Sequence, residues 1–450
     1  MSFLSKYKDV FVIFTSTILY FLFAYFLERT EFYTLVFLWF SLFGCFYYFI
    51  KSNTLNTSTL IGLTVLFRLI FLFSIPNLSQ DFYRFIWDGR MILEGLNPYL
   101  SLPETFIQQG LHPIAESSNL YNGMGEMNGS HYTNYPPINQ LCFLIAALFA
   151  SKSIFGSIIV LRLLIIFADI GILYFGKKLL ERLKLPIKNI FWYALNPFII
   201  IEMTGNLHFE PVMLFFLIWS LYKLHQQKWF WAAILLACSV SVKLIPLLFL
   251  PLFYQWFVKN EERWSKGLQK LFVFYILVFI TIIILFIPFY SSELIANYSN
   301  SVGLWFRNFE FNASFYFIFR EIGYLFRGYN EIAVIGKITP ILTILFLLYT
   351  TFFNKGKTLI QLTTLCLFGL CFYYFTSTTI HPWYLATPLI LSIFTKYRFP
   401  IIWTLVIILS YQAYANNPWK ENLWFVTLEY LIVYGYMIYE IKKNRNIIKL

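Results

Sequence analysis

Apolar runs of similar length recur along the whole chain and alternate with short polar segments. Residues 10–27 and 59–76, for example, form runs of roughly 18 residues, the length that an α-helix needs to cross ~30 Å of hydrocarbon. No polar stretch between the runs is long enough to form a separate soluble domain. The pattern predicts an all-α polytopic membrane protein with a single integral-membrane domain over residues 1–450.

Polar interruptions divide this domain into segments. We expect two N-terminal spans over residues 1–57, a core over 58–395, and C-terminal spans with a basic cytoplasmic tail over 396–450. After the third span the core contains a long loop, 77–136, which we expect to be external and to carry short helices. Altogether the apolar runs predict roughly 12 to 14 transmembrane helices.

Three apolar stretches do not have the length of a simple span. Residues 138–150 would form a helix of only ~20 Å, which predicts a half-helix or an interfacial helix. Residues 190–224 and 229–256 are expected to turn around near 206–210 and 243–246, where polar groups or proline interrupt them. Broken helices are tolerated at membrane depth where the freed backbone lines a polar cavity.

Basic residues gather in clusters between the apolar runs. Two examples are the group Lys177, Lys178, Arg182, Lys184 and Lys188, and the tail Lys442, Lys443, Arg445 and Lys449. Because cytoplasmic loops carry an excess of Lys and Arg, we expect both termini in the cytoplasm. Loop 77–136, with six acidic residues against two arginines, then lies outside, together with the polar clusters at 206–210, 243–246 and 378–384.

The composition agrees with a membrane protein. The chain is 59% hydrophobic and 12% charged, and its mean hydropathy of +0.66 excludes an ordinary soluble domain. The net charge of +12 is accounted for by the orienting clusters, so we expect the lipid bilayer and no nucleic acid as a partner. All five cysteines lie in apolar runs, which predicts neither disulfides nor a zinc site. The first apolar run, residues 10–27, lacks a small-residue cleavage site, so we expect it to remain in the protein as an uncleaved membrane anchor.

The start of loop 77–136 concentrates charge. Asp81, Arg84 and Asp88 stand at i, i+3 and i+7, so on a helix they share one face. A carboxylate at the rim of a low-dielectric cavity can act as a general base, because burial raises its pKa while a nearby arginine keeps it ionised. The alternative is a solvated helix end held by ion pairs. The tight turn implied by Gly95 and Pro98 favours a built site.

Two other places carry charge inside apolar runs. Arg162 and Asp169, two helical turns apart, predict a structural ion pair with each other or with a neighbour. Lys243 is the only charge between Trp229 and Lys259, and burying its ammonium costs ~3 kcal/mol unless an anion compensates. A phosphate is the natural partner, although Lys243 could also extend to the membrane interface.

Polar groups at two further positions could contact a substrate. Asn206, His208 and Glu210 crowd one turn at alternate positions, and the alternative for the histidine is a satisfied core residue. Two metal-ligand residue types without a third nearby predict no obligatory metal. His381 offers a hydrogen-bond donor and Tyr384 an aromatic face that could stack on a sugar, although an interfacial aromatic belt would look similar.

Taken in order, these motifs resemble a known superfamily. The ordered set comprises Asp81, Arg84, Trp87, Asp88 and Gly89; Gly95, Asn97, Pro98 and Tyr99; Tyr135, Pro136 and Pro137; Asn196 and Pro197 with Asn206 and His208; Lys243 with Pro246; and His381, Pro382, Trp383 and Tyr384. It resembles the GT-C superfamily of integral-membrane glycosyltransferases, and above all the bacterial polyprenyl-phosphomannose-dependent mannosyltransferases. The similarity runs from about residue 58 to 395.

The resemblance implies a hexosyltransferase that moves a sugar, expected to be mannose, with inversion from a polyprenyl-phosphate donor. The acceptor would be a glycan, lipid or protein hydroxyl on the extracytoplasmic face of the inner (plasma) membrane. No cofactor would be obligatory, because the lipid phosphate leaves as a stable anion.

On this chain the resemblance assigns roles to particular residues. Asp81 would be the general base and Asp88 the second acid, while Arg84 and Arg90 would hold geometry or phosphate. Lys243 and His381 would contact the donor phosphate. Glu210 stands where many relatives carry aspartate, so the resemblance gives it no clear role beyond a predicted substrate contact.

Two other functions fit a basic, apolar, polytopic chain. A lipid-linked-sugar flippase or other transporter should place its charges at the bilayer midplane, often with repeat symmetry, whereas these gather on one face. A glycan polymerase or ligase with a diphosphate-linked donor is chemically closer. It would use several arginines in a late external loop, for which Arg307, Arg320 and Arg327 are candidates.

Overall fold

A computed structural model describes residues 3–307 and 309–444. Within these ranges, the side chains of residues 7–304 and 309–444 are described. The part it describes is all-helical, without a strand, and one isolated bridge joins Phe311 to Thr379. The predicted fold class is therefore confirmed. Arg445 and Lys449 of the predicted basic tail lie outside the described residues, as does the side chain of Arg307.

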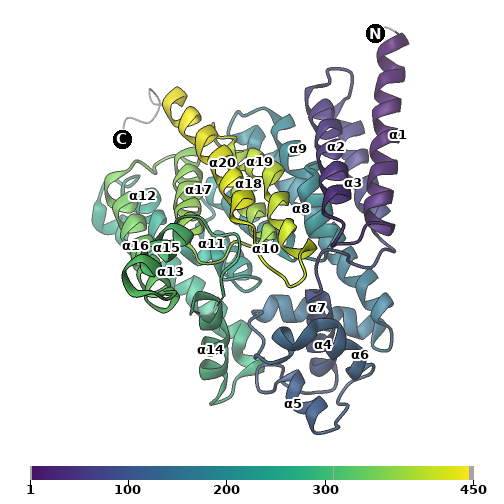
Figure 1. Cartoon of the computed structure of the whole chain (residues 1–450). Helices are drawn as coiled ribbons and strands as arrows, with labels where there is room; N and C mark the ends of the chain where they lie inside the picture. The colour runs from purple at the N-terminus through teal and green to yellow at the C-terminus, as the bar shows by residue number, and fades with distance from the viewer. Residues whose placement is uncertain (1–2, 308, 445–450) are drawn as a thin grey trace.

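The helices follow one another along the chain with short connections (Figure 1). The first third contains α1 (Phe3–Tyr25), α2 (Phe32–Lys51), α3 (Thr57–Ile70), α4 (Asp81–Leu93), α5 (Pro103–Gln108), α6 (Ser117–Gly129) and α7 (Pro137–Ala150). The middle contains α8 (Ile154–Arg182), η1 (Ile187–Ile190), α9 (Phe191–Ala194), η2 (Ile199–Gly205), α10 (Glu210–His225), α11 (Trp229–Val240), η3 (Ile245–Leu252), α12 (Phe253–Val258), α13 (Trp264–Phe286) and η4 (Ile287–Phe289). The last third contains α14 (Leu294–Arg307), α15 (Phe315–Arg327), α16 (Ile332–Phe353), α17 (Leu359–Thr376), η5 (Pro382–Leu385), α18 (Ala386–Ser392), α19 (Phe399–Val406), η6 (Ile407–Ala415) and α20 (Leu423–Asn444).

Six helices of the described chain are long and apolar enough to cross a membrane, or seven if the bent pair η2–α10 counts as one span. Five further apolar helices are shorter, from 10 to 17 residues. The number of full-length spans is thus lower than the roughly 12 to 14 transmembrane helices expected from the apolar runs. The reason is that several runs are divided into short helices by polar residues and proline.

Both expected helix breaks are present. The π-helix η2 ends at Gly205 and α10 begins at Glu210, and the two helices bend by 112° at this break. A second break separates α11, which ends at Val240, from η3, which begins at Ile245. The short segment 138–150 forms most of α7, a helix of 14 residues. These are the features that the lengths of the apolar runs predicted.

Loop 77–136 and the helix that follows it form a cap at one end of the bundle (Figure 1). The cap comprises α4, α5, α6 and α7, with α4 packed against both α6 and α7. The N-terminal end of α1 and the C-terminal end of α20 lie at the opposite end of the bundle. The cap and these two helix ends are therefore on opposite sides of the molecule.

Helices α4 and α7 approach each other closely at Gly89. A Cβ atom added there would collide with the backbone carbonyl of Phe143. One turn away, the rings of Phe85 and Phe143 stack with centroids 4.7 Å apart and an interplanar angle of 6°. Because a carbonyl oxygen cannot move aside as a flexible side chain can, this contact requires glycine.

Arg162 and Asp169 each have buried partners, but they do not pair with each other. Arg68 Nε lies 2.8 Å from Asp169 Oδ2, and Tyr193 donates a hydrogen bond to the same carboxylate at 3.0 Å. Arg162 instead donates hydrogen bonds to the backbone carbonyls of Leu72, Ser74, Thr204 and Gly205. The sequence left two partners open for Asp169, namely Arg162 or a neighbouring residue. In the structure the partner is a neighbouring residue, Arg68.

Breaking the Arg68–Asp169 pair should destabilise the protein strongly. Arg68→Met leaves a buried carboxylate without its cation, which we expect to cost about 3–5 kcal/mol, whereas the double variant Arg68→Met/Asp169→Leu should recover most of that loss. Thermal unfolding of the purified chain in detergent micelles measures both. A double variant that is no more stable than Arg68→Met would contradict this interpretation.

Gly89→Ala should separate α4 from α7, because the new methyl group meets a backbone carbonyl. We expect a loss of roughly 1–3 kcal/mol, the usual cost of overpacking, in the same unfolding assay. Gly62→Ala is the matched control, since a Cβ atom at this helical glycine has nothing within 4 Å. Equal stability of the two variants would show that the contact at Gly89 is not restrictive.

Candidate active site

A cavity of about 680 Å³ opens where the cap meets the helix breaks. Six of the ten predicted site residues line it: Asp81, Arg84, His208, Lys243, His381 and Tyr384. The other four do not line it: Asp88, Arg90, Asn206 and Glu210. Residues more than 300 positions apart in the chain therefore meet around one cavity. This agrees with the prediction that their polar clusters lie on the same side of the membrane.

Asp81 is the only carboxylate among the described residues that line the cavity. It is the first residue of α4, and Asn128 Nδ2 donates a hydrogen bond to its Oδ1 at 3.4 Å. Removal of water by the surrounding protein raises the pKa of this carboxyl, while the charge of Lys243 and the Asn128 hydrogen bond lower it. Asp81 is thus a stronger base than an ordinary aspartate and still has a cation nearby.

Lys243 lies in the break between α11 and η3 and forms an ion pair with Glu210. Glu210 is buried, at the first position of α10, where the helix N-terminus favours negative charge. The lysine side chain remains 21% exposed, toward the cavity that it lines. The two helix breaks are therefore held together by a pair of charges, and Glu210 fixes the position of the ammonium.

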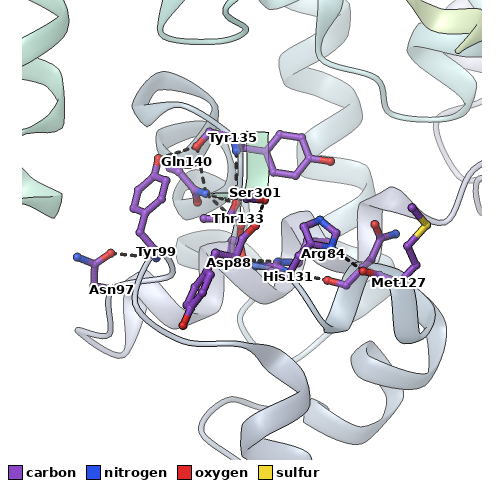
Figure 2. A network of polar contacts seen from close by, with 12 residues as sticks. Arg84, Asp88, Asn97, Tyr99, Met127, His131, Thr133, Tyr135, Gln140 and Ser301 are labelled. Carbon is purple, nitrogen blue, oxygen red and sulfur yellow. Dashed lines mark hydrogen bonds and ion pairs between the residues drawn. The ribbon is translucent and has the colours of Figure 1, made fainter. Parts of the chain in front are cut away.

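Arg84 and Asp88 form the centre of a polar network in the cap (Figure 2). Arg84 Nε lies 2.8 Å from Asp88 Oδ1, and its Nη1 donates to the carbonyls of Asn128 and His131 at 2.5 and 2.9 Å. Gln140 Nε2 donates to Asp88 Oδ2 at 3.0 Å. Asp88 is fully buried, so these two residues are not a solvated helix end. They hold the segment that carries Asn128 against α4.

Arg90 and Asn206 fix the backbone farther from the cavity. Arg90 Nη1 donates to the carbonyl of Ala115 at 2.6 Å, and its Nη2 lies 3.1 Å from Glu116 Oε2. Asn206 accepts a hydrogen bond from the Leu78 amide at 2.8 Å and donates to the Ile201 carbonyl at 3.1 Å. Asn206 thereby ties the first helix break to the segment that leads into α4.

Aromatic rings form the wall of the cavity beside Lys243. Trp383 is stacked between His208 and His381, with ring centroids 3.9 and 4.5 Å apart and interplanar angles of 18° and 3°. Tyr384 meets His381 edge-on at 5.4 Å. Burial and the charge of Lys243 lower the pKa of His381 to about 3. Its ring is neutral at pH 7 and offers hydrogen bonds rather than charge.

Sequence reasoning missed several lining residues. Arg29, in the link between α1 and α2, lines the cavity and places its guanidinium 4.2 Å from the ring centroid of Tyr414. Asn128, which touches Asp81, stands in a polar segment with no distinctive pattern. The only signal for Arg29 was a charge in a short turn between two apolar runs, which is also what an ordinary membrane-proximal loop contains.

Among the described residues, no group of three His, Cys, Asp or Glu side chains could hold a metal ion. His208 and Glu202 approach each other, with Nε2 and Oε2 3.9 Å apart, but they lack a third ligand residue. The expectation of no obligatory metal stays a prediction.

The fold and the cavity define a class: an all-helical integral-membrane protein with a polar, aromatic-walled site under a cap at one end of its bundle. Within that class, the chain belongs to the MptA_B family, described as alpha-(1→6)-mannopyranosyltransferase, whose N-terminal-domain model matches residues 11–259. A comparison with curated proteins gave no match. The family is of the GT-C type, so the predicted glycosyltransferase class and mannosyltransferase activity are confirmed. The matched range contains Asp81, His208 and Lys243 and ends before His381.

Proposed function

We propose that the protein transfers mannose, with inversion, from a polyprenyl-phosphate-mannose donor to a hydroxyl group on a glycan, lipid or protein, with Asp81 as general base. One observation carries the proposal: the only carboxylate among the described lining residues shares the cavity with the Lys243 ammonium. A base for the acceptor and a cation for a leaving phosphate are the two groups that this reaction needs.

The proposed reaction is a single displacement. The acceptor oxygen attacks C1 of the mannose from the side opposite the phosphate, and its proton passes to the ionised carboxylate of Asp81. The C1–O bond to the phosphate breaks, and its electron pair stays on the polyprenyl phosphate. Because one displacement inverts the anomeric carbon, an α-linked product of the kind in the family's name requires a β-linked donor.

The leaving phosphate would lie next to Lys243. A lipid phosphate is stable as an anion, so positioned cations and hydrogen-bond donors replace a general acid. Neutral His381 would donate a hydrogen bond, and Glu210 would hold the lysine in place without reaching the cavity itself. This reaction scheme uses no metal ion and no organic cofactor.

We infer that the cavity faces the extracytoplasmic side of the plasma membrane. Basic clusters predict cytoplasmic termini, and the cap lies at the opposite end of the bundle from the N-terminal end of α1 and the C-terminal end of α20 (Figure 1). A donor with a polyprenyl chain resides in the bilayer, which accounts for a catalytic cavity built into membrane helices.

The late arginines do not favour a polymerase or ligase. Arg320 pairs with Glu310 and Glu321, and Arg327, which is 68% exposed, lies 3.7 Å from Glu331. Neither of the two lines the cavity. Of the late arginines named as candidates, those whose side chains the structure describes therefore add no cation to the cavity.

Asp81→Asn should abolish most of the activity while leaving the fold intact, because the change is nearly isosteric and removes the base. We expect a loss of ~100-fold or more in sugar transfer from one member of a panel of synthetic polyprenyl-phosphate hexoses. Membranes carrying the wild type and the variant are compared. If the wild type consumes no donor while lipid-linked sugar crosses the bilayer of reconstituted vesicles, the flippase alternative replaces this proposal.

The pH profile should report the ionisation of Asp81. Only the ionised carboxylate accepts a proton, so kcat/KM should fall as the pH drops through the pKa of Asp81, which burial raises above the ordinary value. Asn128→Ala removes a hydrogen bond that lowers this pKa, so the acid limb should move to higher pH. Asn134→Ala, at another lining asparagine, should leave it unchanged. If the acid limb of the kcat/KM profile falls at the same pH in the wild type and in Asn128→Ala, the limb reports the ionisation of a group other than Asp81.

A further inference from the structure

We propose that Asn139 binds the hexose of the donor and that its side-chain amide recognises two neighbouring hydroxyl groups of this sugar; the inference rests on the proposed function. Asn139 stands in the first turn of α7 and lines the cavity. The sequence motif at the start of this helix ends at Pro137, two residues earlier, and assigned no role to Asn139.

The side chain of Asn139 lacks hydrogen-bond partners. Among the described residues it is the only one in which both a buried donor, Nδ2, and a buried acceptor, Oδ1, are unpaired. Buried amides are nearly always paired, because otherwise they lose their hydrogen bonds to water and gain none in return. Asn139 is 0% exposed, yet it lines the cavity. A molecule in the cavity can therefore supply the missing partners.

The amide of Asn139 is not used to start its own helix. Asparagine near a helix start often caps the free backbone N–H groups. In α7 the N–H groups of Ile138 and Asn139 instead donate to the carbonyl of Ser241, at 2.9 and 3.4 Å. The backbone of this turn is therefore satisfied from the second helix break, and the side-chain amide of Asn139 is left for another partner.

Asn139 belongs to a helix that packs against the helix of the proposed base. Helices α4 and α7 meet at the stacked rings of Phe85 and Phe143. Asp81 and Asn139 each stand four residues, about one helical turn, before their ring in this pair, so each lies on the same face of its helix as that ring. Both residues line the cavity. The first turns of α4 and α7 therefore bring a carboxylate and an amide to the same space.

The start of α7 also contacts the segment that carries the ammonium group. Ser241, whose carbonyl binds the first turn of α7, stands two residues before Lys243 in the second helix break. In the proposed reaction, C1 of the hexose moves from the phosphate beside Lys243 to the acceptor oxygen beside Asp81. The hexose must therefore lie between these two groups, and α7 contacts the segments that carry both of them.

The chemistry of an amide fits hydroxyl groups better than the other parts of the donor. A hydroxyl group both donates and accepts, so two neighbouring hydroxyl groups can pair with Oδ1 and Nδ2 of one amide. The oxygens of an ionised phosphate only accept, which would leave Oδ1 unpaired, and a polyprenyl chain would leave both atoms unpaired. Of the three parts of the proposed donor, the hexose is the one that satisfies the whole amide.

The next residue along α7 is a matched structural amide. Gln140 Nε2 donates to Asp88 Oδ2 at 3.0 Å and to Thr133 Oγ1 at 3.1 Å (Figure 2). Replacing Gln140 by leucine therefore removes hydrogen bonds that hold the cap together. Replacing Asn139 by leucine, which is similar in size, removes only atoms that have no partner in the described protein.

Thermal unfolding of the full chain in detergent, without substrate, tests whether the amide is free for a ligand. We expect Asn139→Leu to unfold at the temperature of the wild type or above it, because the change removes buried polar atoms that are unpaired. Gln140→Leu should unfold at a lower temperature, because Asp88 loses a hydrogen bond. If Asn139→Leu lowers the unfolding temperature as much as Gln140→Leu does, the amide of Asn139 stabilises the fold, directly or through a bound water, and the proposal is wrong.

Sugar transfer from polyprenyl-phosphate-mannose, and from analogues that each lack one hydroxyl group of the hexose, tests what the amide binds. In the wild type, loss of either of two neighbouring hydroxyl groups should lower kcat/KM roughly ten-fold or more. Asn139→Leu should lower kcat/KM for the complete donor by a similar factor and lose little more with these two analogues, because the partner of the missing hydroxyl group is already gone. The KM of the acceptor should stay the same.

Two results would overturn the assignment. One is that each analogue loses the same factor in the wild type and in Asn139→Leu, which would mean that the amide contacts none of these hydroxyl groups. The other is a higher KM for the acceptor with an unchanged dependence on the donor hydroxyl groups, which would assign the amide to the acceptor. A wild type that uses no polyprenyl-phosphate sugar would refute the proposed function, whereas the unfolding temperatures would still show whether the amide is free for a ligand.

Discussion

Compensation of buried charge is the constraint on which the structure depends. An ionised group inside an apolar bundle costs several kcal/mol unless a partner neutralises it. Arg68 has Asp169, Arg84 has Asp88 and Lys243 has Glu210. Two of these pairs join segments that are far apart in the sequence, so satisfying the charges also decides which helices lie together.

The helix breaks have a related role. Where η2 ends, the Thr204 and Gly205 carbonyls accept hydrogen bonds from Arg162. The side chain of Asn206 then accepts a hydrogen bond from the amide of Leu78, which stands three residues before Asp81. Shortening the spans thus supplies the polar contacts that position the cap. The features that make the chain look irregular as a set of membrane helices are the ones from which its site is assembled.

Much of the fold, and the six predicted residues that line the cavity, could be predicted from local sequence pattern. Apolar runs gave the helices, and polar residues within them gave the breaks after Gly205 and Val240. The positions of the basic clusters predicted that Asp81, His208 and Lys243 lie on the same side of the membrane. Pattern could not reveal the pairing of Lys243 with Glu210 or the arrival of Arg29 at the cavity, because partners across the bundle leave no periodic signal. Pattern also did not show which apolar runs form one helix of full spanning length, since a run of sufficient length can contain two short helices.

Arg29 and Tyr414 bring the first link of the chain against one of its last segments. The family match covers residues 11–259, yet His381, Tyr414 and Trp419 complete the cavity wall. A nascent chain therefore contains Asp81 long before the cavity around this carboxylate is closed. During stepwise insertion into the membrane, the cavity is therefore complete only after residue 419 has left the ribosome, so a half-made molecule has no closed chamber around Asp81.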